Sequence, residues 1–270
     1  MKSTGERLIP KEFQTKEDYI QFLRHQFAYV HVKSRLTPTD NVIEIGFGEG
    51  YGTTILAESG ADIVGIDVEE KAVLHANGRY GGPRCTFMRY DGRRIPFDDG
   101  AFDAAVSFQV IEHIEDDDRF VSEIARVVKS GGKAYLTTPN KTYRLKPGQK
   151  PWNRYHIREY YPEELAALLR KHFESVEILG ISGNDTIQQI EYNRVKTGPF
   201  LDLAAKLNLR KILPERIDYL AAVFISRLKG RRTSHLSSKN FAAQFDVGDF
   251  RVHDKEVDKS LDLLAVCIKQ

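Results

Sequence analysis

Apolar and polar positions along this chain follow a rhythm of short strands and amphipathic helices. The stretch from Thr15 to Leu36 carries apolar residues at helical spacing without Pro or Gly, which predicts a leading helix. Further strands are expected at 41–45, 61–67, 85–90, 101–108 and 133–138, with helices at 52–59, 70–78 and 120–128. Strands that alternate with helices across short connections predict a parallel sheet covered by helices.

The rhythm changes in the second half of the chain. Residues 139–161 form a long polar and aromatic stretch, which predicts a functional loop. A helix opening at Pro162 and a strand at 175–181 follow, and 187–240 is expected to be helical. The apolar run at 260–269 predicts a last strand that rejoins the sheet. We therefore expect one domain over 1–270, with a helical cap (1–37), a core (38–181), an insertion (187–240) and a final strand (260–269).

Composition narrows the class of protein. Hydrophobic residues make up 41% of the chain, and no apolar run approaches the roughly 20 residues that span a bilayer. The first ten residues contain charges and no apolar core, so we expect no secretory signal and a cytoplasmic location. The two cysteines, Cys85 and Cys267, lie far apart, which argues against a disulfide framework or a cysteine-bound zinc ion.

The first strand ends in a cluster of glycines that favours a nucleotide-like ligand. The run VIEIGFGEGYG places glycines at 46, 48, 50 and 52, where the backbone and the following helix N-terminus can approach a ligand closely. A dinucleotide site would place its third glycine one residue later. Asp67 ends the second strand, where its carboxylate could accept hydrogen bonds from ribose hydroxyls. Asp91 follows the third strand and offers a carboxylate to an adenine amino group.

These pieces, in this order, resemble the class I S-adenosylmethionine-dependent methyltransferases. The same order continues through FDAAVSFQVIEHIEDDDRFVSEIARVVKSGGKAYLTTPN and HIREYYPEELAALL. The similarity covers roughly residues 38–180 and the last strand, and it is greatest to ubiquinone-type and polysaccharide-cluster small-molecule enzymes. It implies a Rossmann-like sheet of seven mostly parallel strands with helices on both faces and an antiparallel last strand. The cofactor it implies is S-adenosyl-L-methionine.

The resemblance also implies roles for particular residues. By matching position, the cofactor-binding residues would be Glu44, Gly46, Gly48, Gly50, Asp67, Val68, Asp91, Gly92, Phe108 and Gln109. The glycines would line the methionine and ribose side, with Glu44 at the acidic position of the motif. Asp67 would bind the ribose and Val68 would pack on the adenine. Phe108 and Gln109 would border the methionine portion.

Histidines are the candidates for acceptor-side chemistry. A hydroxyl acceptor benefits from a general base, and histidine is the side chain best matched to neutral pH. His156 lies in the predicted loop and is our candidate catalytic residue, although it could instead anchor the loop together with Arg158. Some RNA-end methyltransferases that resemble this fold use a cluster of Glu and His residues at this position, so the resemblance also raises Glu112 and His113, with Glu115, as possible metal ligands. No second adjacent histidine or downstream partner is evident, so we expect no metal ion.

The charge of the chain is unevenly distributed. Lys and Arg number 40 against 38 Asp and Glu, yet 187–240 contains eleven basic and four acidic residues, a net charge of +7. A basic amphipathic insertion favours an anionic or lipid-linked small-molecule acceptor or peripheral contact with a membrane. Packing against the sheet or a second subunit, as in a homodimer, is the alternative. The basic residues are not interleaved with aromatic residues, which argues against nucleic acid.

The expected function is O-methylation of a small molecule such as a sugar, a sugar nucleotide or a lipid-linked saccharide. Three alternatives stay open: a cofactor-binding interaction protein without turnover, a methyltransferase for a quinone or lipid, and one for RNA. A nicotinamide dehydrogenase is disfavoured. Tyr192 and Lys196 have the Y-x-x-x-K spacing of short-chain dehydrogenases, but they follow the sixth strand and lack an upstream serine at the usual interval.

Overall fold

The computed structural model describes residue 13, residues 15–151, residue 153, residues 155–196 and residues 244–270. Its strands form one mixed sheet in the order β3-β2-β1-β4-β5-β8-β6-β7. The strands are β1 (Asn41–Ile45), β2 (Asp62–Asp67), β3 (Cys85–Arg89), β4 (Phe102–Phe108), β5 (Val128–Pro139), β6 (Ser175–Gly183), β7 (Phe250–His253) and β8 (Asp262–Ile268). The predicted Rossmann-like, mostly parallel sheet is therefore confirmed.

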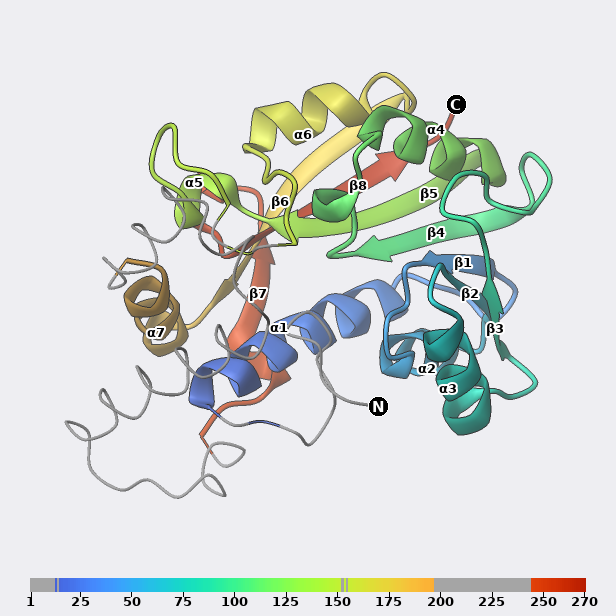
Figure 1. Cartoon of the computed structure of the whole chain (residues 1–270), viewed down its shortest axis with the longest axis horizontal. Coiled ribbons are helices and arrows are strands. Elements are labelled where there is room, and N and C mark those ends of the chain that lie inside the picture. Colours follow the sequence, from blue (N-terminus) through green and yellow to red (C-terminus); the bar gives the residue numbers. More distant parts are fainter. Residues whose placement is uncertain (1–12, 14, 152, 154, 197–243) are drawn as a thin grey trace.

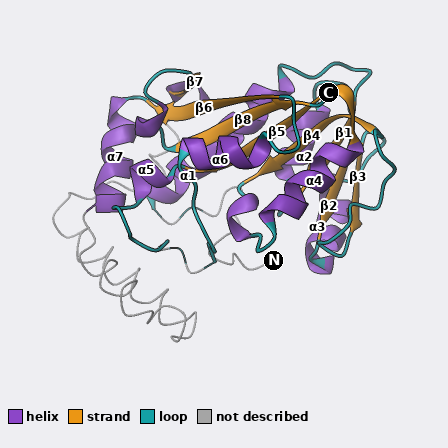
Figure 2. Ribbon diagram, turned by 90° about the horizontal axis from the view of Figure 1, so that it is seen from above, coloured by secondary structure: helices purple, strands orange, loops and turns teal. Residues whose placement is uncertain are grey.

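Helices cover both faces of this sheet (Figures 1 and 2). One face carries α1 (Lys16–Lys33), α2 (Tyr51–Ala57) and α3 (Glu70–Tyr80), and α7 (Asp185–Lys196) packs beside α1. The opposite face carries α4 (Asp117–Val127) and α6 (Pro162–Leu169). Two short helices, η1 (Ile111–His113) and α5 (Lys141–Arg144), follow β4 and β5. The predicted polar loop thus begins with a helical turn.

The sheet has eight strands and not the seven that the resemblance implies. Strands β1 to β5 pair in parallel, and β8 inserts antiparallel between β5 and β6, as expected for the last strand. The additional strand, β7, pairs antiparallel with the edge of β6. Its register sets Ile181 beside Val252 and Gly183 beside Phe250. Phe250 is buried, so the extra strand extends the core where α1 and β6 meet.

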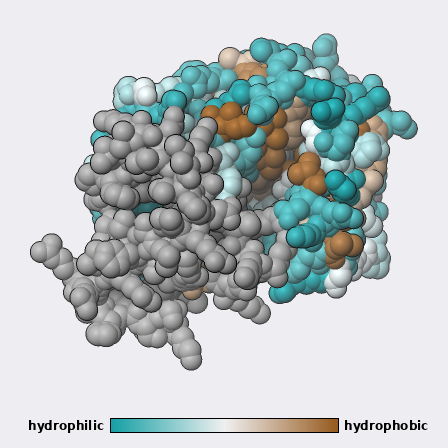
Figure 3. Space-filling model, viewed as in Figure 1, coloured by the Kyte–Doolittle hydropathy of each residue, from teal (hydrophilic) through white to brown (hydrophobic). Residues whose placement is uncertain are grey.

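Parallel pairing fixes the position of the candidate site. The carboxyl ends of β1, β2, β4 and β5 reach the same edge of the sheet, which is where open α/β sheets bind ligands. On the face drawn in Figure 3, a recess with apolar walls and a hydrophilic rim lies near the middle of the molecule.

The predicted insertion is described only at its beginning. Residues up to 196 belong to α7, and the rest of 187–240 lies outside the described residues. Of the predicted cap, the described part is residue 13 and the segment from Thr15 onward. The Thr15 hydroxyl accepts the Asp18 N–H, and the Asp18 carboxylate accepts the Thr15 N–H, a capping box that starts α1. None of the described helices is both long and apolar enough to cross a membrane.

Candidate active site

The glycine-rich turn joins β1 to α2 and leaves its central backbone open. Gly46, Gly48 and Gly50 have φ angles of 78°, 61° and 92°, which residues with a side chain rarely adopt. A Cβ on Gly46 would lie 2.6 Å from Val110 Cγ2, whereas a Cβ on Gly48 would meet no atom within 4 Å. The turn is thus closely packed at its start and has room beside Gly48 for a ligand that approaches the backbone.

Glu44 is buried next to this turn and is held by two hydroxyl groups. The Tyr29 hydroxyl donates to Oε1 at 2.7 Å, and the Thr53 hydroxyl donates to Oε2 at 2.5 Å. Burial raises the pKa of Glu44 to about 7, although both hydrogen bonds act in the opposite direction. Glu44 therefore connects β1 to α1 through Tyr29 and to α2 through Thr53. These two hydrogen bonds hold the strand and the helix on either side of the turn.

Asp67 closes the turn from the end of β2. Asp67 as a residue is 6% exposed. Its Oδ2 accepts the Gly48 N–H at 3.0 Å, and its Oδ1 accepts the Glu69 N–H at 2.9 Å. A carboxylate oxygen can accept more than one hydrogen bond. Asp67 can therefore hold the turn and still bind a ribose hydroxyl, as the resemblance implies.

A platform suited to a flat ring lies beside Asp67. Val68 is 53% exposed, and a Cβ on Gly92 would lie 3.0 Å from Val68 Cγ1. The neighbouring Asp91 accepts the backbone N–H groups of Arg93 and Arg94. These hydrogen bonds lower the pKa of Asp91 and favour its ionised, hydrogen-bond-accepting form.

The two residues expected at the methionine side have different environments. Phe108 is buried, and its ring centroid lies 4.9 Å from that of Tyr29, so this ring packs against α1. Gln109 is partly exposed and has a φ angle of 56°, a strained conformation for a residue with a Cβ. Its N–H donates to the Thr137 carbonyl at 2.8 Å. This bend directs the chain from β4 into η1.

His156 is oriented by a buried carboxylate. His156 Nδ1 lies 2.9 Å from Glu159 Oε1, which also lies 3.3 Å from Arg144 Nε. Burial opposes ionisation of Glu159, but the charge of Arg144 and the His156 hydrogen bond outweigh it and lower the pKa of Glu159. Burial lowers the pKa of His156. The arrangement is a neutral imidazole held by an ionised carboxylate.

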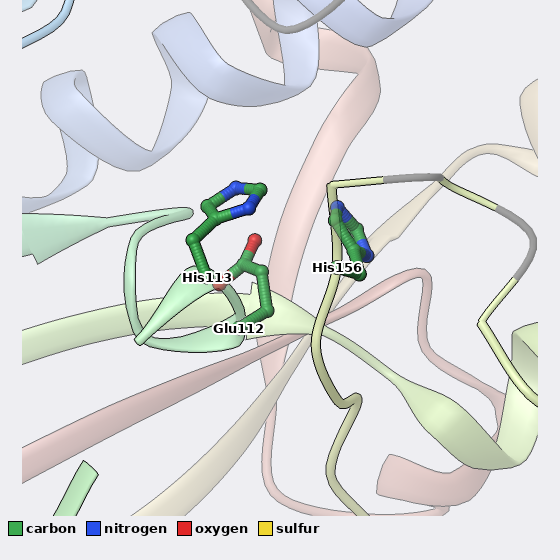
Figure 4. Close-up of side chains that lie close together, drawn as sticks. All are labelled: Glu112, His113 and His156. Atoms are coloured by element: carbon green, nitrogen blue, oxygen red, sulfur yellow. The ribbon is translucent and has the colours of Figure 1, made fainter. Parts of the chain in front are cut away.

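The fold places His156 close to Glu112 and His113. The sequence did not reveal this proximity. The His113 and His156 ring centroids lie 5.0 Å apart, and Figure 4 shows the Glu112 carboxylate beneath the His113 ring, with the His156 ring across from both. Glu112 is fully buried, and its Oε2 accepts the Thr138 hydroxyl at 3.0 Å. Burial raises the pKa of Glu112 to about 8. His156 thus lies beside Glu112 and His113 as a downstream partner that was not evident from the sequence.

The Y-x-x-x-K pair lies on α7, away from the ends of β1, β2 and β4. Tyr192 is 45% exposed on this helix, which packs against α1 and β6. A dehydrogenase arrangement at the glycine-rich turn is thus not formed by Tyr192.

Comparisons with known proteins identify the family of enzymes to which this chain is similar. Residues 43–136 match the model of a methyltransferase domain. A probable S-adenosylmethionine-dependent methyltransferase of Mycobacterium tuberculosis is 32% identical over 98% of this chain and 89% of its own length. A ubiquinone biosynthesis O-methyltransferase of Sinorhizobium medicae is 30% identical over 107 residues, covering 38% of this chain and 42% of its own length.

A solved structure shares the fold. The methyltransferase from Thermotoga maritima that is described as a possible histamine N-methyltransferase superposes with a TM-score of 0.54. The two chains are 17% identical, and the match covers 94% of this chain and 95% of the other. With the long match to the mycobacterial relative and the open glycine-rich turn, the conclusion follows that this chain belongs to the S-adenosylmethionine-dependent methyltransferases and uses S-adenosylmethionine as its cofactor.

Proposed function

We propose that this enzyme transfers a methyl group to an oxygen atom of a small molecule such as a sugar, a sugar nucleotide or a lipid-linked saccharide. The observation that carries the proposal is the polar, buried group formed by His156, Glu159 and Glu112 beyond the ends of β4 and β5. Such side chains suit an acceptor that must lose a proton. The ubiquinone relative, itself named an O-methyltransferase, supports the same acceptor atom.

The cofactor residues position the methyl donor. Bound S-adenosylmethionine supplies a methyl group already activated by its sulfonium, so the protein contributes orientation and water exclusion. We propose that the space beside Gly48 lets the methyl donor approach the backbone of the turn. Asp67 would bind the ribose of the donor, and Val68 and Gly92 would contact its adenine. The remaining members of the set are Glu44, Gly46, Gly50, Asp91, Phe108 and Gln109. Of these, Glu44 and Phe108 act from the core, since both are buried.

His156 is the proposed catalytic residue on the acceptor side. The acceptor oxygen forms a bond to the methyl carbon, the carbon–sulfur bond breaks with its electron pair moving to sulfur, and the hydroxyl proton passes by way of the activating group to solvent. We propose that His156 activates this hydroxyl while Glu159 fixes the orientation of the ring. Arg144 in turn holds Glu159 through an ion pair.

The rest of the chain supports an acceptor of this class. The net charge of +7 over 187–240 favours an anionic group on the acceptor. We propose that residues 1–270 act as one methyltransferase domain, because β8 inserts between β5 and β6 and so the segments before and after the insertion share one sheet.

Cofactor binding and labelling test the proposal. Calorimetry should detect S-adenosylmethionine binding that Asp67→Ala weakens at least tenfold, because the carboxylate also holds the glycine-rich turn. A cell metabolite extract incubated with methyl-labelled cofactor should yield a labelled, base-stable ether. His156→Ala should lower its formation by about 10² to 10⁴, whereas His172→Ala should not. Labelled nitrogen or carbon products, or unchanged turnover in His156→Ala, would reject the assignment.

A further inference from the structure

We infer that Glu112, His113 and His156 together bind a divalent transition-metal ion on the acceptor side of the active site. The inference rests on the proposed function and specifies how His156 would activate the acceptor: through a bound cation and not by taking up the proton itself.

The three side chains are close enough to share one ion. One potential ligand atom from each, a carboxylate oxygen and two imidazole nitrogens, lies within 4.8 Å of the others. Three atoms so spaced always have a common point within about 2.8 Å of each, against roughly 2.0–2.2 Å for zinc bound to nitrogen or oxygen. Closing this difference takes shifts below an ångström in each side chain. The residues come from two segments, η1 and the loop before α6 (Figure 4).

The Glu112 carboxylate has one oxygen without a hydrogen-bond partner. Oε2 accepts the Thr138 hydroxyl, while Oε1 is buried and accepts no hydrogen bond from the described part of the chain. Leaving a buried polar atom unpaired costs about 1–3 kcal/mol, and more for a charged group. In Figure 4 one oxygen of the carboxylate points toward the His113 ring. A cation held among the three side chains would pair with Oε1 and favour the ionised form of Glu112.

Both imidazoles are oriented as metal-binding histidines usually are. His156 Nδ1 contacts the Glu159 carboxylate at 2.9 Å, and His113 Nδ1 contacts the Tyr155 carbonyl oxygen at 3.1 Å. Such contacts set the tautomer that presents Nε2 to a metal. The Ile157 N–H donates to the Glu112 carbonyl at 2.9 Å. This hydrogen bond joins the loop to η1 and holds the two halves of the cluster together.

The position and ligand types indicate the role of the ion. η1 follows directly after Val110, whose side chain packs on Gly46 of the cofactor turn. Two imidazoles and one carboxylate favour zinc, iron, cobalt or manganese over magnesium or calcium, and they leave coordination positions open. An acceptor hydroxyl bound there would be acidified. Its proton would pass to solvent, its oxygen would bond to the methyl carbon, and the carbon–sulfur electron pair would move to sulfur.

Metal titration of the full chain tests the inference directly. After chelator treatment and dialysis, calorimetry with Zn²⁺ should show one site per chain, and Co²⁺ should produce visible absorption bands. Glu112→Gln and His156→Ala should weaken binding at least about 100-fold, and Glu159→Gln should weaken it about 10- to 100-fold. The control His172→Ala removes a partly exposed histidine paired with Asp118 and should bind both ions like the wild type.

The same samples separate the two proposals. S-adenosylmethionine binding to the metal-free protein tests the function, and metal binding tests the cluster. If the cofactor binds but the dissociation constants of both Zn²⁺ and Co²⁺ exceed about 100 μM, the proposed cation site is wrong. The proposed function would still stand. Equal affinity in the wild type and in a folded Glu112→Gln variant would also reject it. If that variant does not fold, absent Co²⁺ bands in the wild type decide the matter. Full labelling activity in excess chelator would reject the catalytic role of the cation.

Discussion

At the scale of single residues, Glu44 makes stability depend on pH in an unusual direction. Its pKa in the folded protein is about 7, above its ordinary value of about 4.3. The folded state therefore retains a proton that the unfolded state releases as the pH rises between these values. The contribution of Glu44 is complete below the lower value and lost above the higher one. We expect wild-type stability to fall relative to Glu44→Gln, by up to about 1.4 kcal/mol per pH unit.

Urea denaturation of both proteins between pH 5 and 8, as a rough window set by these values, measures this difference. The comparison cancels the other titrating groups because they are common to both proteins. A difference in unfolding free energy that stays constant across the window would mean that Glu44 is ionised throughout.

The part of the site that could be predicted from the sequence is the part where the backbone conformation requires a particular residue type, glycine. The glycine spacing indicated the turn, and all three glycines have positive φ. Gln109 also has positive φ, but a glutamine gives no sign of this in the sequence. The contact of His156 with His113 depends on the path of a long loop, fixed by tertiary hydrogen bonds such as Ile157 to Glu112. No local pattern encodes those bonds.

At the scale of elements, the packing of α1 on α2 depends on the absence of a side chain at Gly52. A Cβ there would lie 2.1 to 2.4 Å from three atoms of the Tyr29 ring. Gly52→Ala should therefore displace α1 and disturb the Tyr29 hydrogen bond to Glu44, at a cost of about 1–3 kcal/mol. Gly78→Ala is the matched control in α3, where a Cβ would meet no atom within 4 Å.

The two substitutions should have opposite effects in thermal unfolding. Gly78→Ala should stabilise the protein by about 0.5–1 kcal/mol, because alanine is the better helix former. Gly52→Ala should also weaken S-adenosylmethionine binding, since α2 continues from the cofactor turn. Equal stability of the two variants would show that α1 adjusts without loss.

The hydrophobic pattern located most elements but not all of their ends. The strand at 41–45 has the predicted bounds, whereas α3 continues past Gly78 to Tyr80. β5 begins at Val128 and not at 133, because Val128 already pairs with Phe102 at the start of β4. β7 was missed, since its four residues carry too short a pattern to stand out.

At the scale of the whole molecule, a buried ion cluster joins segments from both ends of the chain. Arg24 on α1 lies 3.1 Å from Glu191 on α7 and 2.7 Å from Asp262 at the start of β8. Arg194 lies 2.7 Å from the same Glu191. Arg24, Glu191 and Asp262 are each at most 2% exposed. The helical cap, the start of the insertion and the final strand are thus held together electrostatically, which sequence patterns could not predict because these residues are far apart along the chain.

Removing the central cation should destabilise this arrangement more than the loss of its contacts alone. Arg24→Met keeps much of the side-chain volume but leaves Asp262 buried without its partner, at an expected cost of about 3–5 kcal/mol in the free energy of unfolding. Lys33→Met is the control on the same helix. Its ion pair with Glu58 is 29% and 62% exposed, and such pairs contribute about 0–1 kcal/mol.

A double substitution separates charge from packing in the same urea denaturation series. Arg24→Met with Asp262→Leu removes both charges, and a buried pair replaced by apolar residues of similar size is often nearly neutral. If the uncompensated carboxylate is the cause, the double variant should regain most of the stability lost in Arg24→Met. A double variant as unstable as the single one would place the cost in the packing of α1 against β8. The ion cluster would then lie at the contact between α1 and β8 without contributing much to the free energy of unfolding.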